Sequence, residues 1–313
     1  MKVLIVCRSK NEIIAPYIVR QEESLRKLDI KTEYFLVLNK GWKGYFSHLF
    51  DLRKKINQFK PDIIHAHYGF SGLLTVLQRK TPVITTFHGS DINYPFALFL
   101  SKITIRLSAW SIFVSSELAN KADAKNYYSI IPCGIDLELF YPLQKNEARQ
   151  MTGWEPNEKV ILFSSSSANL VKNYPLAITA VRQFNDLNPT KPPARLYELT
   201  GYPQEKVNIL LNACDIALLT SKSEGSPNFI KEAMACNRPI VSTNVGDVGS
   251  LMEDIPGCFI AQDNPDDIAD KIRQAFHFEH SFGARQRLID RRLEINETAA
   301  KIVRVYEMVL RIK

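Results

Sequence analysis

Closely spaced cysteines, glycine-rich loops and long apolar runs are all scarce in this sequence of 313 residues. The five cysteines are scattered, and none stands in a C-x-x-C pair. Disulfide frameworks and zinc knuckles need closely spaced cysteines, so the sequence disfavours both. Most of these cysteines lie inside apolar runs, which predicts buried thiols and a reducing compartment.

No stretch of the chain is apolar for long enough to cross a membrane. The apolar start at residues 1–7 meets charged residues before it reaches the length of a signal-peptide core. The longest apolar neighbourhood, residues 94–110, is interrupted by Lys102 and Arg106, and a spanning helix needs about 20 mostly apolar residues. We therefore expect a cytoplasmic protein, either free or peripheral on the inner face of a membrane.

Charge is distributed unevenly along the chain. The formal net charge is +7, from 40 Lys and Arg against 33 Asp and Glu. The first 140 residues carry 19 basic and 12 acidic residues, whereas the rest of the chain carries 21 of each. A basic surface suits nucleic acid, an anionic membrane or anionic small substrates. No base-reading module is visible, so we expect no nucleic-acid partner.

Strand-like apolar runs alternate with helical patterns along the whole chain. The first series of runs covers residues 1–7, 31–38, 63–67, 82–87 and 111–115. After a turn-rich segment at residues 132–142, a second series covers residues 159–164, 195–199, 215–219, 239–242 and 258–261. Such alternation predicts an α/β fold with doubly wound parallel sheets. We expect two Rossmann-like domains facing a central cleft, at residues 1–141 and 142–295.

Two helical patterns carry further expectations. An amphipathic helix at residues 296–313 is expected to cross back to the N-terminal domain. Another helix is expected at residues 42–59, with core positions at Phe46, Leu49, Phe50, Leu52 and Ile56. Its basic and aromatic side chains suit an anionic membrane face, although an ordinary solvated helix fits equally well. These side chains are Trp42, Lys43, Tyr45, Phe46, Arg53, Lys54, Lys55 and Lys60.

A pair of glutamates gives the strongest sign of chemistry. Glu224 and Glu232 follow the run at residues 215–219, and Ser226 and Pro227 between them read as the cap and first residue of a helix. Free backbone N–H groups near residues 228–230 would attract a phosphate. Carboxylates beside a phosphate site are costly unless they accept hydrogen bonds from hydroxyls, such as those of ribose and sugars.

This segment resembles the retaining glycosyltransferases of family 4, which have the GT-B fold. Their signature is E-x7-E followed by A-M-A-x-x-x-P-V/I, and here Glu232 is followed by AMACNRPIV. The resemblance continues in order through DIIHAH at residues 62–67, TFHGSD at 86–91, IPCGID at 131–136, NLVKN at 169–173 and NACD at 212–215. This ordered set covers nearly the whole chain.

The resemblance implies the reaction. A sugar would pass from a UDP- or GDP-sugar to a hydroxyl of a glycan or lipid-linked acceptor, with retained anomeric configuration, in the synthesis of cell-surface polysaccharide or glycolipid. No cofactor and no metal would be required, and the sequence contains no D-x-D motif. His65 and His67 share one face of a strand, and a structural or cleft-lining role is favoured over metal binding.

The resemblance also assigns roles to residues. Glu232 would bind ribose hydroxyls, Glu224 would hold the donor sugar, and Lys172 would neutralise the leaving diphosphate. His88 would face the donor sugar near the reaction centre. The diphosphate and sugar would lie against backbone groups of Ser226, Asn228, Phe229 and Ile230, and base recognition is expected near Thr200 and Gly201.

Two departures from the family pattern leave alternatives open. Ser167 stands near the position of a family arginine, and the loop at residues 8–11 lacks the usual glycines. Arg8 or Asn11 could contact the acceptor by side chain instead, with Asp91 also on the acceptor side. The departures motivate a non-catalytic, nucleotide-sugar-binding partner subunit as one alternative. A GT-B sugar-nucleotide epimerase is another, although the glutamate pair argues against it.

Overall fold

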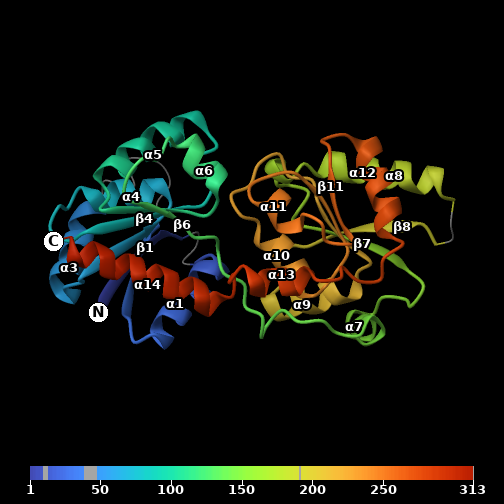
Figure 1. The fold of residues 1–313 in the computed structure, drawn as a ribbon, viewed down its shortest axis with the longest axis horizontal. Coiled ribbons are helices and arrows are strands. Elements are labelled where there is room, and N and C mark those ends of the chain that lie inside the picture. The colour runs from blue at the N-terminus through green and yellow to red at the C-terminus, as the bar shows by residue number, and fades with distance from the viewer. Residues whose placement is uncertain (10–12, 39–47, 190–191, 313) are drawn as a thin grey trace. The chain divides into compact units, whose positions relative to one another are not determined.

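The chain forms two compact units, each built on a parallel sheet (Figure 1). The computed structural model describes residues 1–9, 13–38, 48–189 and 192–312. Unit 1 comprises Met1–Gly134 and Ile295–Lys313, and unit 2 comprises Ile135–Glu294. The sequence placed these boundaries at residues 141 and 295. Both units show the alternating strands and helices of the predicted α/β fold.

Unit 1 contains a six-stranded sheet in the order β2-β1-β3-β4-β5-β6, with all pairs parallel. Its strands are β1 (Lys2–Arg8), β2 (Lys31–Val37), β3 (Ile63–His67), β4 (Val83–Phe87), β5 (Trp110–Phe113) and β6 (Tyr128–Ile130). Its helices are α1 (Pro16–Lys27), α3 (Leu49–Phe59), α4 (Gly69–Val76), α5 (Pro95–Leu107), α6 (Ser116–Lys121) and α14 (Ile295–Arg311).

Alternate residues of β1 enter the two hydrophobic cores of unit 1, because successive strand side chains point to opposite faces. Val3 and Ile5 pack with α1 and α14, while Leu4 and Val6 pack with α3 and α4. Both faces are therefore covered, which explains why β1 is an uninterrupted apolar run rather than an alternating one.

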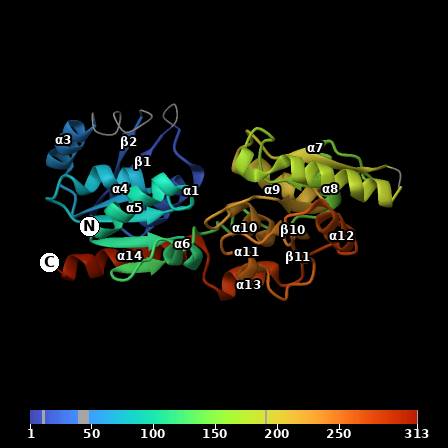
Figure 2. The same cartoon turned by 90° about the horizontal axis from the view of Figure 1, so that it is seen from above.

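Helix α14 returns the end of the chain to unit 1, where it packs beside α1 (Figures 1 and 2). Its buried side chains include Ile302, Val305, Tyr306 and Val309, at the 3–4 residue spacing of one helix face. The Tyr306 hydroxyl lies 2.6 Å from Nδ1 of His65 on β3. The last helix thus completes both the core and a buried polar contact of unit 1.

Unit 2 contains a five-stranded parallel sheet in the order β11-β10-β9-β7-β8. Its strands are β7 (Lys159–Phe163), β8 (Ala194–Glu198), β9 (Ile216–Leu219), β10 (Ile240–Thr243) and β11 (Cys258–Ala261). Its helices are α7 (Lys145–Thr152), α8 (Tyr174–Leu187), α9 (Gln204–Ala213), α10 (Asn228–Ala235), α11 (Val248–Met252), α12 (Pro265–Ala275) and α13 (Ala284–Asp290), and η1 (Leu170–Lys172) is a short 3₁₀ turn.

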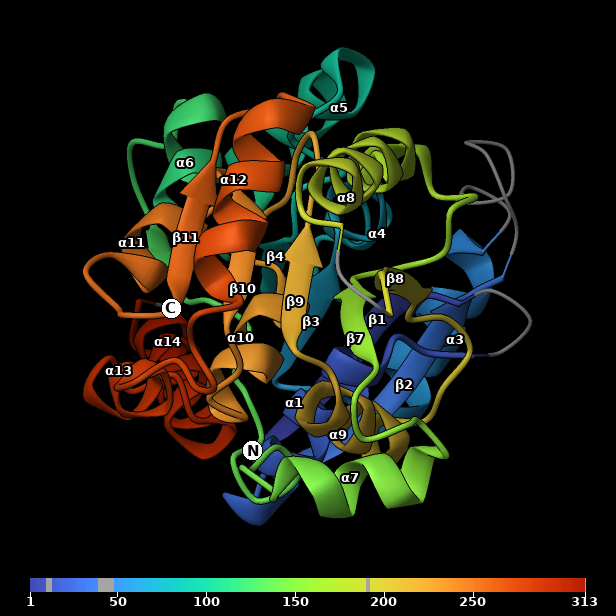
Figure 3. The ribbon, with the colours of Figure 1, turned by 90° about the vertical axis from the view of Figure 1, so that its right-hand side faces the viewer.

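Helices cover the two faces of this sheet in groups. Helices α8 and α12 lie side by side over one face (Figure 3), where they share a core with Ile161 and Phe163 of β7. Helices α9 and α10 cover the other face, against Val160 and Leu162. The loops at the carboxyl ends of β7 and β9 are consequently fixed by packed elements on both sides.

Several expectations from the sequence need correction. Phe50 is not a core residue: it is 77% exposed, while Leu52 and Ile56 of the same helix are buried as predicted. The short strand β6 was not predicted at all. Phe46 and the rest of the expected helix before residue 48 lie outside the described residues.

The burial of the cysteines and the apolar character of the helices can be compared with the sequence expectations. Four of the five cysteines are buried, as expected, Cys258 is partly exposed, and none of the five forms a disulfide. Among the described residues, no helix combines the length and the apolar character needed to span a membrane.

Candidate donor and acceptor sites

Lys172 and Glu224 meet in unit 2 although they are far apart in the sequence. Lys172 ends the turn η1 that follows β7, and Glu224 lies in the loop that follows β9. Because β7 and β9 are parallel neighbours, their carboxyl ends lie at the same edge of the sheet. The Lys172 Nζ donates to Oε1 of Glu224 at 2.6 Å, and both side chains are 18% exposed. This contact brings together two of the residues singled out from the sequence.

Hydrogen bonds hold the two loops that carry this pair. The Thr220 hydroxyl donates to the carbonyl of Lys172 at 2.9 Å, and the Lys222 N–H donates to the carbonyl of Val171 at 2.9 Å. The Ser221 hydroxyl donates to the same Glu224 oxygen at 2.7 Å. Glu224 therefore accepts from two donors that are fixed in place before any ligand arrives.

Helix α10 begins at Asn228, with Pro227 at its cap position and no side-chain cap. The prediction that Ser226 caps the helix is wrong. Its hydroxyl donates to Oδ2 of Asp247 at 2.6 Å and accepts from Nζ of Lys231 at 3.0 Å. Phe229 and Ile230 are buried, so only their backbone could face a ligand.

The first turn of α10 retains groups that suit an anion. It contains no acidic residue, so its free N–H groups and the positive end of the helix dipole stay uncompensated by side chains. The Oδ1 atom of Asn228 is buried and has no hydrogen-bond partner. A buried polar atom without a partner is costly, which is consistent with a ligand group completing this site.

Glu232 lies one turn further along α10 and is only partly exposed. Burial raises the pKa of its carboxyl to about 7, against the opposing effects of Lys231 and Lys172. The carboxylate is thus mostly buried, and its exposed part can accept hydrogen bonds from ligand hydroxyls.

Lys231 and Asp247 were missed by the sequence reasoning. Lys231 is completely buried within α10, and burial raises the pKa of the Asp247 carboxyl. The lysine stands inside the E-x7-E segment, and a charged residue on the apolar face of a short helix is the sign that could have identified it. Asp247 lies 21 residues from its partner Ser226, so no local pattern indicates it.

The remaining donor-side residues lie around the end of β8. The Ser167 N–H donates to Oε2 of Glu198 at 2.7 Å, so the last residue of β8 anchors the serine loop. Thr200 and Gly201 follow β8 and are exposed. Gly201 has φ +73° with open space around it. These residues lie at the carboxyl edge of the unit 2 sheet, where open α/β sheets bind ligands.

In unit 1, His88 follows β4 and lies in a cluster of aromatic and imidazole rings. Its Nε2 is 3.0 Å from Nδ1 of His67, and its Nδ1 is 3.8 Å from Sγ of Cys133. The rings of Tyr68 and Tyr17 lie 4.7 and 5.1 Å from the His88 ring. Burial lowers the pKa of both His65 and His67, the former to about 3. The described residues contain no group of His, Cys, Asp or Glu that could hold a metal ion.

Asp91 is buried beside this cluster and organises the backbone. Its carboxylate accepts hydrogen bonds from the N–H groups of Gly89, His88 and Gly69, at 2.9 to 3.3 Å. Burial raises the pKa of Asp91 to about 6, although these N–H groups oppose the shift. Asp91 thus ties the loop after β4 to the first residue of α4.

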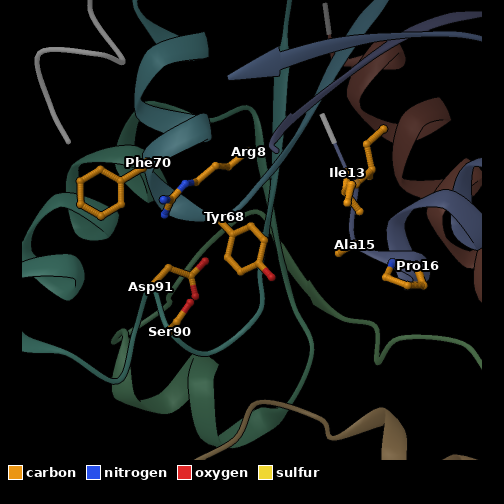
Figure 4. A pocket seen from close by; sticks show the side chains of 9 residues that line it. Arg8, Ile13, Ala15, Pro16, Tyr68, Phe70, Ser90 and Asp91 are labelled. Carbon is orange, nitrogen blue, oxygen red and sulfur yellow. The ribbon is translucent and has the colours of Figure 1, made fainter. Parts of the chain in front are cut away.

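A cavity of about 700 Å³ opens next to Asp91 within unit 1. Figure 4 shows Arg8 and Asp91 on the side of Phe70, Tyr68 in the middle, and Ile13, Ala15 and Pro16 opposite them in this view. The lining residues are Arg8, Ile13, Ile14, Ala15, Pro16, Tyr68, Phe70, Ser90 and Asp91. Two of the three residues expected on the acceptor side therefore line one cavity. The third, Asn11, lies outside the described residues.

Two family models match the chain in the order of its two units. The model described as Glycosyltransferase Family 4 matches residues 2–139, and the model described as Glycosyl transferases group 1 matches residues 159–277. The chain belongs to these family 4, group 1 glycosyltransferases.

Curated glycosyltransferases are similar to this chain at modest sequence identity. The teichuronic acid biosynthesis glycosyltransferase TuaC of Bacillus subtilis is 28% identical over 61% of this chain, and the alignment spans 55% of that relative, little more than half its length. The O-antigen biosynthesis glycosyltransferase WclY of Escherichia coli is 23% identical over 83% of this chain and 82% of its own length.

Solved structures identify the fold as GT-B, with two Rossmann-like units. Sucrose-phosphate synthase from Thermosynechococcus elongatus superposes with a TM-score of 0.82, at 13% identity over 99% of this chain and 100% of that chain. The HepE protein of Anabaena in complex with UDP-glucose gives 0.73 at 15% identity, over 97% and 99%. The UDP-GlcNAc 2-epimerase of Methanocaldococcus jannaschii gives 0.63 at 13% identity, over 98% and 100%.

Proposed function

We propose that the protein transfers a sugar from a UDP- or GDP-sugar to a hydroxyl of a glycan or lipid-linked acceptor, with retention and without a metal. The observation that carries the proposal is the Lys172–Glu224 pair beside the uncapped start of α10. It supplies a cation and free N–H groups for a diphosphate, and a carboxylate for sugar hydroxyls.

The ion pair suggests how donor binding proceeds. When the diphosphate reaches α10, the Lys172 ammonium turns from Glu224 toward the phosphate oxygens. Glu224, still held by Ser221, is then released to accept hydrogen bonds from the donor sugar. Glu232 accepts from the ribose hydroxyls. Lys172 and Glu224 each exchange one partner for another, so neither charge is left buried and unpaired.

In the reaction, the bond from the anomeric carbon to the diphosphate breaks and a bond to the acceptor oxygen forms on the same face. The acceptor's hydroxyl proton passes to the leaving diphosphate. Preorganised donors that meet the developing negative charge are Lys172 and the N–H groups of α10. We assign His88 to the donor sugar and Ser167, in the serine loop, to the phosphate. Thr200 and Gly201 are assigned to the base of the nucleotide.

The names of similar proteins support a role in the synthesis of cell-surface polymers. TuaC and WclY are named for teichuronic acid and O-antigen biosynthesis, and HepE was solved with UDP-glucose. We therefore propose a role in the synthesis of cell-surface polysaccharide or glycolipid. The basic unit 1 would place the protein at the cytoplasmic face of an anionic membrane. Co-sedimentation with neutral and anionic liposomes tests this location, and equal, negligible binding to both would contradict it.

The activity is tested by a donor screen with UDP-, GDP- and ADP-sugars, following sugar transfer or slow donor hydrolysis. Lys172→Ala should lower turnover by about tenfold or more, since one lost donor to a developing oxyanion costs about 10²–10³ in rate. Glu224→Ala should also lower it by about tenfold or more, because the carboxylate that accepts from the sugar hydroxyls is lost. Lys222→Ala is the matched control, because this exposed lysine lies in the same loop. Unchanged activity in Lys172→Ala would overturn the site assignment.

The same screen separates the two other functions. Donor binding without turnover, with any lipid extract as acceptor, would identify a partner subunit. Formation of a new sugar-nucleotide, with no transfer to an acceptor, would identify an epimerase, whose fold this chain shares with the Methanocaldococcus enzyme.

A further inference from the structure

The cavity of unit 1 continues onto an exposed apolar face of α5. Phe70, which lines the cavity, has its ring 6.5 Å from the ring of Phe96 in the first turn of α5. Phe99, Ile103 and Leu107 follow at 3–4 residue spacing, so all four lie on one helix face. The exposed fractions of these side chains are 67% for Phe96, 63% for Phe99, 38% for Ile103 and 50% for Leu107.

The opposite face of α5 explains why these side chains point outward. Ala97, Ser101 and Thr104 are buried against unit 1, and the Thr104 hydroxyl donates to the carbonyl of Gly69. Two exposed basic residues, Lys102 and Arg106, flank the apolar face. Apolar side chains flanked by basic ones are typical of a helix that lies in the interface of an anionic membrane.

The wall of the cavity also presents groups that suit an oxyanion, with Arg8 on the side of Phe70 (Figure 4). Arg8 at the end of β1 is exposed, and no described carboxylate pairs with it. Ala15 and Pro16 form the start of α1, whose first turn has no acidic residue and no side-chain cap. The guanidinium fork matches the oxygens of a phosphate, and the start of a helix adds positive potential.

The one carboxylate in the cavity wall does not cancel this potential. Asp91 is only 3% exposed, and its oxygens accept from the N–H groups of Gly69, His88 and Gly89. These donors compensate the carboxylate charge locally. An anion near Arg8 consequently meets the guanidinium without facing an uncompensated Asp91.

The charge of the two units agrees with this assignment. Unit 1 carries 23 Lys and Arg against 12 Asp and Glu, whereas unit 2 carries 17 against 21. The basic excess is therefore larger in unit 1 than the first 140 residues alone indicate, because residues 295–313 add basic residues and because Asp136 and Glu138 belong to unit 2. Such a field raises the encounter rate of anionic ligands with unit 1.

We propose that the cavity and the exposed face of α5 together bind the lipid phosphate of a lipid-linked acceptor, whose glycan hydroxyl receives the sugar. Its oxyanion pairs with Arg8, and its apolar chain leaves over Phe70 and runs along Phe96 and Phe99. The inference rests on the proposed function and names the class of its acceptor. It also moves the membrane-facing surface from the region of residues 42–60 to α5.

Calorimetric titration of the full chain, without any donor, tests the cavity. The probes are decyl phosphate, decyl glucoside with the same chain but no charge, and methyl phosphate with the charge but no chain. Decyl phosphate should bind about tenfold more tightly than either, as expected for a charge-assisted hydrogen bond and for buried methylene groups. Equal affinity for decyl phosphate and decyl glucoside would overturn the oxyanion site. Equal affinity for decyl and methyl phosphate would overturn the lipid assignment in favour of a soluble phosphate.

Two pairs of variants assign the effects to residues. Arg8→Gln should remove the preference for phosphate over glucoside, while Arg53→Gln, an exposed arginine on α3, should keep it. Phe96→Ser should remove the gain from the decyl chain, while Phe50→Ser, an exposed phenylalanine on α3, should not. Equal effects within either pair would contradict the proposal.

Vesicles test the membrane surface. The double variant Phe96→Ser/Phe99→Ser should lose most of its binding to phosphatidylcholine vesicles that contain phosphatidylglycerol, and Phe50→Ser should not. A dimer in light scattering that Phe96→Ser dissociates would assign the α5 face to a second copy and overturn the proposal. A protein that binds decyl phosphate but never turns over contradicts only the proposed function. An active protein that binds none of the probes contradicts only this inference.

Discussion

The affinity for a nucleotide sugar should fall as the solution is acidified through pH 7, because of Glu232. The free protein holds this carboxyl at a pKa of about 7 by burial. Ribose hydroxyls donate hydrogen bonds, so the proposed contact needs the ionised carboxylate as acceptor. With that pKa, nearly all molecules are ionised at pH 8 and about one in ten at pH 6. The dissociation constant of UDP-glucose should therefore rise about tenfold between these values, or about 1.4 kcal/mol.

Calorimetry with UDP-glucose or GDP-glucose measures this effect directly, since the diphosphate diester does not titrate in this range. In Glu232→Gln the affinity should be lower and independent of pH. In Lys172→Met the midpoint should move to higher pH, because Lys172 lowers the Glu232 pKa. Asp247→Asn should keep the wild-type slope and serves as the control for a nearby titrating carboxyl.

Three results would refute the reasoning. A flat affinity in the wild-type protein would mean that no titrating carboxylate touches the ligand. The same slope in Glu232→Gln would assign the titration to another group. Tighter binding at lower pH would mean that the protonated carboxyl donates to the ligand, which reverses the proposed contact.

Further predictions concern stability. Glu232→Gln should raise the melting temperature more at pH 8 than at pH 5, because the raised pKa lowers stability progressively as the pH rises from 4.5 to about 7, where the unfolded state ionises and the folded state does not; equal shifts at both pH values would contradict this. Arg149→Met should cost about 3 kcal/mol or more in urea unfolding, because the buried guanidinium donates to the carbonyls of Ala213, Pro156 and Glu158 and shares Asp215 with Lys145, whereas the exposed Arg182→Met should cost little. Gly72→Ala should cost about 1–3 kcal/mol by overpacking, since its Cβ would lie 2.5 Å from Cγ2 of Thr104; an unfolding midpoint like that of the wild type would mean that α4 shifts freely.

The sequence predicted those parts of the fold that depend on local apolar patterns. The strands at 63–67 and 258–261 have the predicted bounds, because each is a short run of mostly apolar residues bounded by turn residues. The strand β6 escaped prediction because its three residues are partly or fully exposed and carry no apolar run. Phe50 was misassigned because helical spacing alone does not tell which apolar residues face the sheet.

The site was predictable where family motifs supply the residues, and not where tertiary contacts do. Lys172 and Glu224 were identified from the sequence, and the parallel pairing of β7 with β9 explains why they meet. Ser226 was expected to cap α10, but its hydroxyl binds a carboxylate from a distant loop and a lysine inside the helix. A distant partner of this kind competes with local capping and leaves no trace in the neighbouring sequence.

The return of α14 to unit 1 has a consequence for synthesis on the ribosome. The apolar face of the unit 1 sheet that receives Ile302, Val305 and Tyr306 is complete only after the end of the chain emerges. Unit 2 lies between as an insertion of about 160 residues, which takes roughly 10–30 s to translate at 5–20 residues per second. During that interval one face of the nascent N-terminal sheet is covered by α1 but not by α14, whereas unit 2 is contiguous and can fold as it emerges. Chaperone capture should therefore concentrate on nascent chains that end before residue 295.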